Sequence, residues 1–448
     1  MKEKIAIIGG GLSGSLLAIC LAKRGFQVEV YERRGDIRKG QAEAGRSINL
    51  ALSTRGIEAL KKVGLAEKVL QDAIPMTGRM MHSVKGELNY QPYGKSGQFI
   101  NSVSRSGLNV KLLELADEYD NVKLFFNHKC VDVDLNINTA VLENDKGEKI
   151  TIEANIMFGS DGAFSAIRSE MQKTNRFNYS QTYENYGYKE LEILPGKNGE
   201  FQIEKNALHI WPRGEFMMIA LPNPDGSFTC TLFLAYDGEK SFSNLKSKVD
   251  VTAFFENYFP DAMGMMPNYL EDFFNNPTGN LATIRCNPWV YKNFALIGDA
   301  AHAVIPFYGQ GMNCSFEDVS ELDEIIETYY PDWTTILQKY QEARIVNANA
   351  IADLACKNFV EMRDLVGQPA FMHFKKVEQE LSETYPDIYR SQYSLVSFST
   401  SPYSYALAQG FKNEALIQYI IEHKIEDKIK DSNTMMPLFR DFLGEVTI

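Results

Sequence analysis

Short apolar runs and one stretch of helical periodicity follow one another at the amino terminus. Residues 5–8 form an apolar run that leads into glycines, residues 12–24 carry apolar side chains at helical spacing, and residues 28–31 form a second strand-like run. A short apolar run bounded by glycine is typical of a buried strand, and apolar residues three and four positions apart are typical of a helix. The pattern predicts a βαβ unit and a parallel sheet.

The pattern changes twice further along the chain. Strand-like runs at 190–194, 216–221 and 228–234, with a turn-forming segment at 222–226, predict a second and largely antiparallel sheet between about residues 176 and 285. From about residue 317 onward helical periodicity dominates, at 319–330, 333–359 and 405–429. The chain is therefore expected to be an α/β protein with a helical carboxyl-terminal region.

Length and composition narrow the class of protein. A chain of 448 residues, 44% of them hydrophobic and 23% charged, is long enough for two domains with buried cores. The formal charge of −12 disfavours a nucleic-acid partner, because binding to phosphate backbones needs clustered basic residues. The six cysteines are scattered without a CxxC pair, so we predict no metal site and no disulfide framework.

The ends of the chain show no targeting or anchoring signal. The first residues enter an apolar strand at once, and no stretch reaches ~18 consecutive apolar residues. Residues 427–448 mix charged and large apolar side chains, which is typical of a docked amphipathic segment. We expect a cytoplasmic protein without a transmembrane anchor, and a homodimer is left open.

A glycine-rich motif stands between the first strand and the first helix. Gly9, Gly11 and Gly14 fit GxGxxG, and Glu32 ends the second strand. Glycines allow a tight turn and close approach of a diphosphate, the helix amino terminus attracts its charge, and an acidic residue binds ribose hydroxyls. A glycine-rich turn that binds no dinucleotide is the alternative. Because Glu32 disfavours a 2′-phosphate, FAD or NAD is expected here instead of NADP.

Two further glycine–aspartate motifs follow apolar runs. Residues 159–168 include Asp161 and Arg168, and residues 295–302 include Asp299. Each by itself also fits a strand-to-helix turn with an aspartate cap. In their order after GxGxxG, the three motifs resemble the fingerprints of the class A flavoprotein hydroxylases. The resemblance implies that Asp299 binds FAD, that Asp161 and Arg168 support the nucleotide sites, and that NADPH binds without a domain of its own.

The segment 306–318 contains two glycines just before a predicted helix. Backbone N–H groups at a helix amino terminus can meet the pyrimidine edge of a flavin and stabilise its anionic reduced form. Gly311, Met312 and Asn313 are therefore candidates for that edge. His302 is tempting as a base, but a histidine in such a turn is more often structural.

A series of segments, in this order, resembles the kynurenine 3-monooxygenase family over nearly the whole chain to about residue 398. The segments are AGRSINLALSTRG at 44–56, IPMTGRMMH at 74–82, QPYG at 91–94, SVSR at 102–105, LHIWPR at 208–213 and NFVEMR at 358–363. The family position occupied by Tyr308 varies, and the carboxyl terminus does not resemble that of the membrane-anchored members.

This resemblance implies a set of binding residues. Arg79 and Tyr93 would hold the carboxylate of L-kynurenine, which suits a guanidinium because its two N–H groups meet a carboxylate in a bidentate way. The remaining substrate residues would be Asn358, Glu361 and Tyr393 at the polar end, and Met217, Ile219, Leu221, Phe233, Pro306 and Phe307 around the ring. For FAD the family pattern adds Ser13, Arg33, Arg34, Ala51, Arg105 and Cys130. A surface salt bridge for Arg79 and an ordinary core for the alternating strand are the competing interpretations.

The resemblance also implies fold and activity. It implies a discontinuous Rossmann-like FAD-binding domain of the glutathione-reductase type (1–75, 100–175, 286–330), a mostly antiparallel substrate domain (76–99, 176–285) and a helical carboxyl-terminal region (331–448). NADPH would reduce FAD, O₂ would form a flavin C4a-hydroperoxide, and kynurenine would become 3-hydroxykynurenine, in tryptophan degradation toward quinolinate and NAD. Since the cofactor supplies the chemistry, no side chain is nominated as an obligatory base. A hydroxylase of another aromatic acid and a non-hydroxylating NADPH-oxidising flavoprotein are the alternatives.

Overall fold

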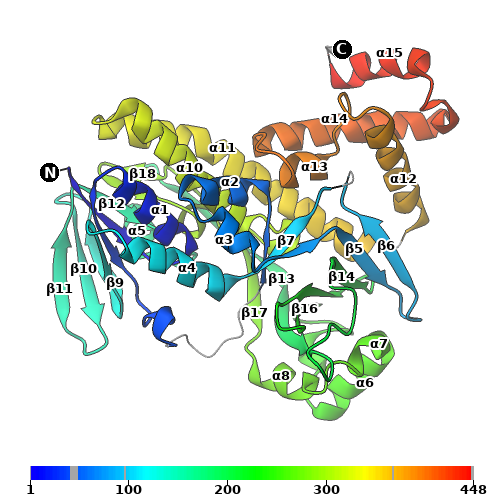
Figure 1. Ribbon diagram of the computed structural model, residues 1–448, viewed down its shortest axis with the longest axis horizontal. Helices are drawn as coiled ribbons and strands as arrows, with labels where there is room; N and C mark the ends of the chain where they lie inside the picture. The colour runs from blue at the N-terminus through cyan, green and yellow to red at the C-terminus, as the bar shows by residue number, and fades with distance from the viewer. Residues whose placement is uncertain (1, 41–48, 95–96, 366–367, 445–448) are drawn as a thin grey trace. The chain divides into compact units, whose positions relative to one another are not determined.

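The structure is a computed structural model that describes residues 2–40, 49–94, 97–365 and 368–444, apart from the side chain of residue 364 (Figure 1). Two compact units are present. The first consists of Met1–Ile74, Asn101–Glu184 and Thr278–Ala352, and the second of Pro75–Ile100, Asn185–Pro277 and Asp353–Ile448. Residues 331–448, which the sequence grouped as one helical region, are divided between the two units.

A six-stranded sheet forms the centre of the first unit. Its order is β18 (Val290–Tyr291), β19 (Phe294–Leu296), β12 (Ile156–Gly159), β1 (Lys4–Ile8), β2 (Gln27–Tyr31) and β8 (Val122–Phe125). All neighbours are parallel except β18 and β19. Residues 5–8 of β1 are almost fully buried, as expected of a parallel strand covered on both faces. With α1 (Leu12–Lys23) between β1 and β2, the predicted βαβ unit is confirmed.

Smaller sheets and several helices complete the first unit. The smaller sheets consist of β9 (His128–Asp134), β10 (Thr139–Asn144) and β11 (Lys149–Glu153), and of β3 (Asn49–Leu52), β7 (Ile100–Ser104) and β4 (Ile74–Met76), of which β4 lies mostly in the second unit. Strand β17 (Gly279–Asn287) is an edge strand of a seven-stranded sheet. The helices include α2 (Thr54–Lys62), α3 (Ala66–Leu70), α4 (Arg105–Asp117), α5 (Ala166–Met171), α9 (Asp299–His302), α10 (Gly311–Tyr329) and α11 (Trp333–Val360), the last of which continues into the second unit.

The second unit is built on six strands of a seven-stranded sheet. They follow the order β13 (Asn178–Ile193), β16 (Phe228–Ala235), β15 (Met217–Pro222), β14 (Ala207–Pro212), β5 (Gly78–His82) and β6 (Leu88–Pro92). Neighbours are antiparallel except β14 and β5, which are parallel. The helices are α6 (Lys248–Tyr258), α7 (Pro260–Met263), α8 (Tyr269–Asn275), α12 (Pro369–Thr384), α13 (Gln392–Ser397), α14 (Tyr403–Glu422) and α15 (Ser432–Leu443).

The two faces of this sheet bury different sets of side chains. Met218 and Ala220 of β15 and Trp211 of β14 pack with residues of α6 and α7 in one apolar core. Strand side chains alternate between faces, and partners in register share a face. The pairings Arg79 with Leu208, Ile210 with Ile219, and Met217 with Phe233 therefore place one cation and several apolar side chains together on the opposite face.

The helices predicted near the carboxyl terminus are present with shifted ends. Helix α11 covers the predicted stretch 333–359, and α10 begins earlier than the predicted residue 319. The prediction for 405–429 was wrong at its end, because α14 stops at Glu422 and Lys424 adopts a positive φ of 54° that interrupts the helix. A short 3₁₀ turn, Glu426–Lys428, follows.

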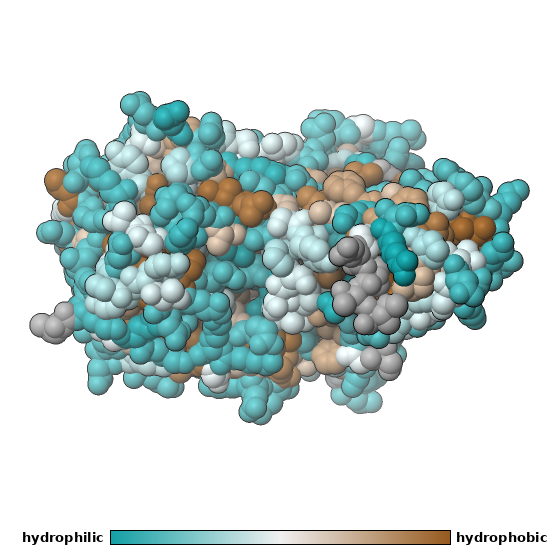
Figure 2. All heavy atoms as spheres, turned by 90° about the horizontal axis from the view of Figure 1, so that it is seen from above, coloured by the Kyte–Doolittle hydropathy of each residue, from teal (hydrophilic) through white to brown (hydrophobic). Residues whose placement is uncertain are grey.

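Within the described residues, no helix is both long enough and apolar enough to cross a membrane. Figure 2 shows one face of the molecule, on which hydrophobic residues gather in several separate groups within a mainly hydrophilic surface.

Candidate functional site

The three glycine-rich motifs meet at one edge of the parallel sheet. Strands β1, β12 and β19 are neighbours, with Ile8 opposite Gly159 and Gly159 opposite Leu296. Each motif begins where its strand ends, and the carboxyl ends of parallel strands lie at the same edge. Open parallel sheets bind their ligands at that edge.

The glycines of the first motif differ in how much room each leaves for a side chain. A Cβ on Gly14 would lie 2.0 Å from the carbonyl oxygen of Gly9, and one on Gly9 would lie 2.4 Å from that of Ser160. Gly11 has no atom within 4 Å of such a Cβ. The first bond within α1 is Ser15 N–H to Gly11 O, so the preceding N–H groups of the helix, including that of Ser13, are available to an anion in the space beside Gly11.

Glu32 closes the loop around this motif. Its carboxylate accepts the N–H of Gly10 at 2.9 Å and bonds to the backbone and side chain of Arg34 at 3.0 and 2.8 Å. Glu32 is buried, while the side chains of Arg33 and Arg34 are exposed. Glu32, the predicted acidic residue, thus stabilises the turn through these hydrogen bonds.

Asp161 of the second motif lies in a strongly desolvated position. One carboxylate oxygen accepts the N–H of Ala166 at 2.6 Å, and the other is buried with no hydrogen-bond partner. Burial raises the pKa of Asp161 above its usual value. Burial together with Asp161 raises the pKa of the Cys130 thiol to about 12. Such an oxygen can accept a hydrogen bond from a bound ligand.

Arg168 connects the second and third motifs. Its guanidinium donates to the carbonyl of Ala300 at 2.8 Å and to that of Ala163, and it lies over the ring of Tyr179. The buried Arg168 side chain therefore links the two turns by hydrogen bonds.

The third motif and the start of α10 form the remaining wall. Gly298 has a φ of +62°, and a Cβ there would lie 2.7 Å from the hydroxyl oxygen of Ser13. Asp299, the next residue, is exposed. The first bond within α10 is Cys314 N–H to Gln310 O, so the N–H groups of Gly311, Met312 and Asn313 are available to a ligand.

The side-chain amide of Asn313 makes its hydrogen bonds to protein backbone groups. Its oxygen accepts the N–H of Ser53 at 2.9 Å, and its nitrogen donates to the carbonyls of Ala51 and Gly309 at 2.8 and 2.9 Å. Only its backbone can therefore meet a flavin. Of the other FAD candidates, Arg105 is exposed at the start of α4, and residues 44–48 of the family segment lie outside the described residues.

Arg79 in the second unit lies over two tyrosine rings. Its guanidinium carbon is 5.0 Å from the ring centroid of Tyr393 and 5.6 Å from that of Tyr93. Burial raises the pKa of both phenols, and Arg79 partly opposes this shift. The phenols therefore stay protonated and can donate hydrogen bonds at neutral pH. A cation flanked by neutral donors is suited to a carboxylate.

Sequence reasoning missed one cation of this region, Lys375. Its ammonium lies 3.6 Å from Glu361 and 3.0 Å from Glu378. Burial alone would lower the pKa of Lys375, but the two carboxylates raise it. No pattern could have identified it, because Lys375 and Glu378 look like an ordinary helix-surface pair. Glu361 begins a π-helical turn, Glu361–Leu365, and the buried Asn358 donates to the sulfur of Met362 at 3.4 Å.

The predicted apolar lining residues fall in both units. Met217, Leu221 and Phe233 are buried in the second unit, and Ile219 is partly exposed. Pro306, which is exposed, and Phe307, which is buried, belong to the first unit.

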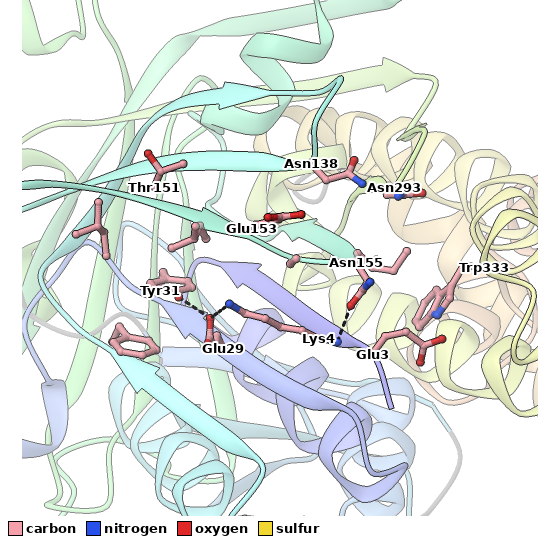
Figure 3. Close-up of a pocket in the computed structure, with 15 residues that line it drawn as sticks. Glu3, Lys4, Glu29, Tyr31, Asn138, Thr151, Glu153, Asn155, Asn293 and Trp333 are labelled. Atoms are coloured by element: carbon pink, nitrogen blue, oxygen red, sulfur yellow. Dashed lines mark hydrogen bonds and ion pairs between the residues drawn. The ribbon is translucent and has the colours of Figure 1, made fainter. Parts of the chain in front are cut away.

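A cavity of about 900 Å³ lies elsewhere in the first unit (Figure 3). Some of its polar groups are bonded to one another: the Lys4 ammonium lies 2.8 Å from Glu29, the Lys4 backbone N–H donates to Asn155 at 2.9 Å, and Tyr31 donates to Glu29. The cavity contains none of the glycine motifs. We therefore do not regard it as the functional site.

Comparisons with known proteins give matches over most of the chain. An FAD-binding-domain family model matches residues 2–355. Curated kynurenine 3-monooxygenases from Dictyostelium discoideum and Flavobacterium psychrophilum are 47% and 48% identical; the matches cover 94% and 95% of this chain and the same shares of those proteins.

Solved structures show the same fold at lower identity. A 2-methyl-3-hydroxypyridine-5-carboxylic acid oxygenase aligns with a TM-score of 0.67 and 19% identity, over 83% of this chain and 95% of that one. A tetracycline destructase aligns with a TM-score of 0.61 and 16% identity, over 89% and 99%. The matched FAD-binding domain and the extensive sequence identity show that the chain belongs to the kynurenine 3-monooxygenase family of FAD-dependent monooxygenases.

Proposed function

We propose that this protein converts L-kynurenine to 3-hydroxykynurenine with NADPH and O₂, using FAD as its cofactor. The observation that supports this best is the position of Arg79 beside Tyr93 and Tyr393, on the sheet face that also carries Met217 and Ile219. One end of the substrate is an amino acid and the other is an aromatic amine. The face offers a cation for the first and apolar side chains for the second.

Arg79 binds the substrate carboxylate, and the two phenols donate to the same oxygens. The rings flanking the guanidinium restrict its orientation, which favours a bidentate bond. Glu361 is suited to the substrate ammonium, and Lys375 offsets its charge when no substrate is bound. The apolar lining excludes water from the aromatic ring.

The first unit holds FAD. The N–H groups at the start of α1 and the space beside Gly11 suit its diphosphate, Asp299 suits the ribityl chain, and the N–H groups of Gly311 and Met312 suit the flavin ring. When bound, FAD takes electrons from NADPH and activates O₂ for transfer of one oxygen atom to the substrate. The ring amine of kynurenine already activates the neighbouring carbon. The protein therefore needs to orient the ring and exclude water, and no general base is required.

The test is NADPH oxidation by the FAD-loaded protein with and without L-kynurenine, with products identified by mass spectrometry. We expect oxidation to depend on kynurenine and the product to be heavier by one oxygen atom. An aminophenyl ketone without the amino-acid group serves as the control substrate, because it cannot use Arg79. Formation of H₂O₂ alone would instead support a non-hydroxylating flavoprotein. Hydroxylation of a different aromatic acid, with no effect of kynurenine, would support the other alternative.

A further inference from the structure

The carboxylate of Asp318 contacts both ends of the short helix α9. Asp318 lies in α10 and is fully buried. One of its oxygens accepts the backbone N–H of Gly298, the residue just before α9, at 3.1 Å. The same oxygen accepts Nε2 of His302, the last residue of α9, at 2.5 Å. Asp299, the candidate ligand of the FAD ribityl chain, is the first residue of the helix held in this way.

Helix α9 is too short to fix its own orientation, which depends on contacts from other elements such as Asp318 and Arg168, the latter donating to the carbonyl of Ala300. It contains only four residues, and its N-cap is Gly298, which has no side chain to cap the helix. Isolated helices of this length are unstable, because nucleation is costly and few bonds repay it. Gly298 also adopts a φ of +62°, a conformation that a glycine adopts freely but does not enforce. External contacts must therefore hold the turn.

The second oxygen of Asp318 is anchored to the rest of the first unit. It accepts Nε of Arg344 in α11 at 2.8 Å, and Arg344 also binds Glu317 at 2.8 Å. Glu317 in turn pairs with Arg55 of α2. One carboxylate oxygen of Asp318 thus bonds to the turn that contains α9, and the other bonds to Arg344 of α11. Glu317 belongs to the same network, and its carboxylate bonds to Arg344 and Arg55, whereas Asp318 contacts the two ends of α9.

Opposite charges lie next to one another in this network. Burial alone would raise the pKa of Asp318, but His302 and Arg344 lower it. Burial alone would lower the pKa of His302, but Asp318 and Cys314 raise it well above its usual value. The His302 ring also stacks on that of Trp289, with 5.0 Å between centroids. The histidine is therefore a charged structural partner of Asp318, which agrees with the structural interpretation from sequence.

The network could be mistaken for a metal site, since one ligand atom each of His302, Cys314 and Asp318 lie within 4.8 Å of one another. The guanidinium of Arg344 already supplies the cation there. It donates to Asp318 and lies 3.5 Å from the sulfur of Cys314. A metal ion would have to displace a buried, doubly ion-paired arginine.

We propose that Asp318 is a positioning residue for FAD binding, which clamps both ends of α9 and so holds Asp299 and the neighbouring turn in the orientation the cofactor needs. Asp318 acts through the turn and does not itself touch FAD. This inference rests on the proposed FAD site of the first unit.

The test compares Asp318→Asn, His302→Gln and the control Glu317→Gln. FAD affinity is measured by titrating each full-length apoprotein with FAD and following flavin fluorescence, and global stability by thermal unfolding of the same apoproteins. Because hydrogen bonds to charged groups are among the stronger ones, we expect Asp318→Asn to raise the dissociation constant of FAD by roughly tenfold or more. His302→Gln should raise it several-fold. Glu317→Gln should lower the melting temperature but leave the dissociation constant within about twofold of wild type.

Two results would overturn the proposal: an unchanged dissociation constant in Asp318→Asn, or an equal rise in Glu317→Gln, which would mean that any weakening of the buried network loosens FAD. Should Asp318→Asn fail to fold, His302→Gln decides, since it breaks the clamp at one end only. A wild-type apoprotein that does not bind FAD would refute the proposed function itself. Normal wild-type binding together with unaffected variants would refute only the role of Asp318.

Discussion

The phenol rings of Tyr93 and Tyr393 stack in parallel, with 5.3 Å between their centroids and 9° between their planes. Tyr93 follows β6, whereas Tyr393 lies in α13, far along the chain from Tyr93. Arg79 lies over both rings. The stack therefore links a strand, a loop and a carboxyl-terminal helix around one guanidinium, and it gives the proposed carboxylate site a rigid geometry.

Replacing Arg79 by lysine keeps the charge but loses the planar group held by this stack. We expect Arg79→Lys to lower kcat/KM for L-kynurenine by roughly 10- to 100-fold, mainly through a higher KM, because bidentate binding of the carboxylate is lost. The matched control is Arg440→Lys on the exposed surface of α15, which should leave both constants unchanged. Steady-state NADPH oxidation at varied kynurenine measures this. A normal KM in Arg79→Lys would argue against the assigned carboxylate site.

The first glycine motif predicts two different outcomes for similar substitutions. Gly11→Ala should fold normally, because the residue has φ −75° and open space beside its Cβ, yet it should weaken FAD binding by placing a methyl group where the diphosphate is expected. Gly14→Ala should fold poorly, because its Cβ would lie 2.0 Å from a backbone oxygen. Circular dichroism and FAD titration of both variants separate the two effects. Equal FAD affinity in Gly11→Ala and wild type would contradict the diphosphate position.

Neighbouring residues of β15 face opposite sides of the sheet and should respond differently to truncation. Ile219→Ala removes part of the proposed substrate wall, so we expect KM for kynurenine to rise roughly tenfold with little loss of stability. Met218 is fully buried in the core on the other face. Met218→Ala should cost about 2–5 kcal/mol of unfolding free energy, with KM unchanged. Kinetics and urea unfolding of the two variants check this. If Met218→Ala raised KM and Ile219→Ala lowered stability instead, the substrate would lie on the other face of the sheet.

A buried histidine in the second unit predicts a pH-dependent stability. His209 accepts from His82 at 2.8 Å and donates to the carbonyl of Glu204 at 2.7 Å, because that carbonyl can only accept. Burial, together with the nearby His82, lowers the pKa of His209 to about 4 from 6.5. Between pH 6.5 and about 4, His209 therefore binds a proton in the unfolded chain but not in the folded protein. The resulting stability is fully present above pH 6.5 and is lost as the pH falls toward 4.

His209→Gln removes this titration and keeps a side chain that can hydrogen-bond to its neighbours. Between pH 6.5 and 4 the unfolding free energy of wild type should fall more steeply than that of the variant, by at most about 1.4 kcal/mol per pH unit. Urea unfolding of both proteins at several pH values measures the difference. Parallel pH profiles would show that His209 is protonated equally in the folded and unfolded states.

By itself, the sequence determined the elements that depend on neighbouring residues: the βαβ unit with its glycine motif, and the existence of the long helices. Strand and helix periods and the steric freedom of glycine act within a few residues, so they can be recognised without coordinates. The family segments also pointed to Arg79, Tyr93 and Tyr393. The end of α14 was misjudged because the positive φ of Lys424 leaves no mark on the hydrophobic pattern.

Only the tertiary structure decided which of these residues act together. Arg79 shares a face with Met217 and Ile219 because of the register of β5, β14, β15 and β16, and a shift by one residue would point it to the other side. Lys375 meets Glu361, and Asp318 meets both ends of α9, through packing between elements far apart in sequence. Such contacts depend on the arrangement of whole strands and helices, which no local pattern of residues specifies.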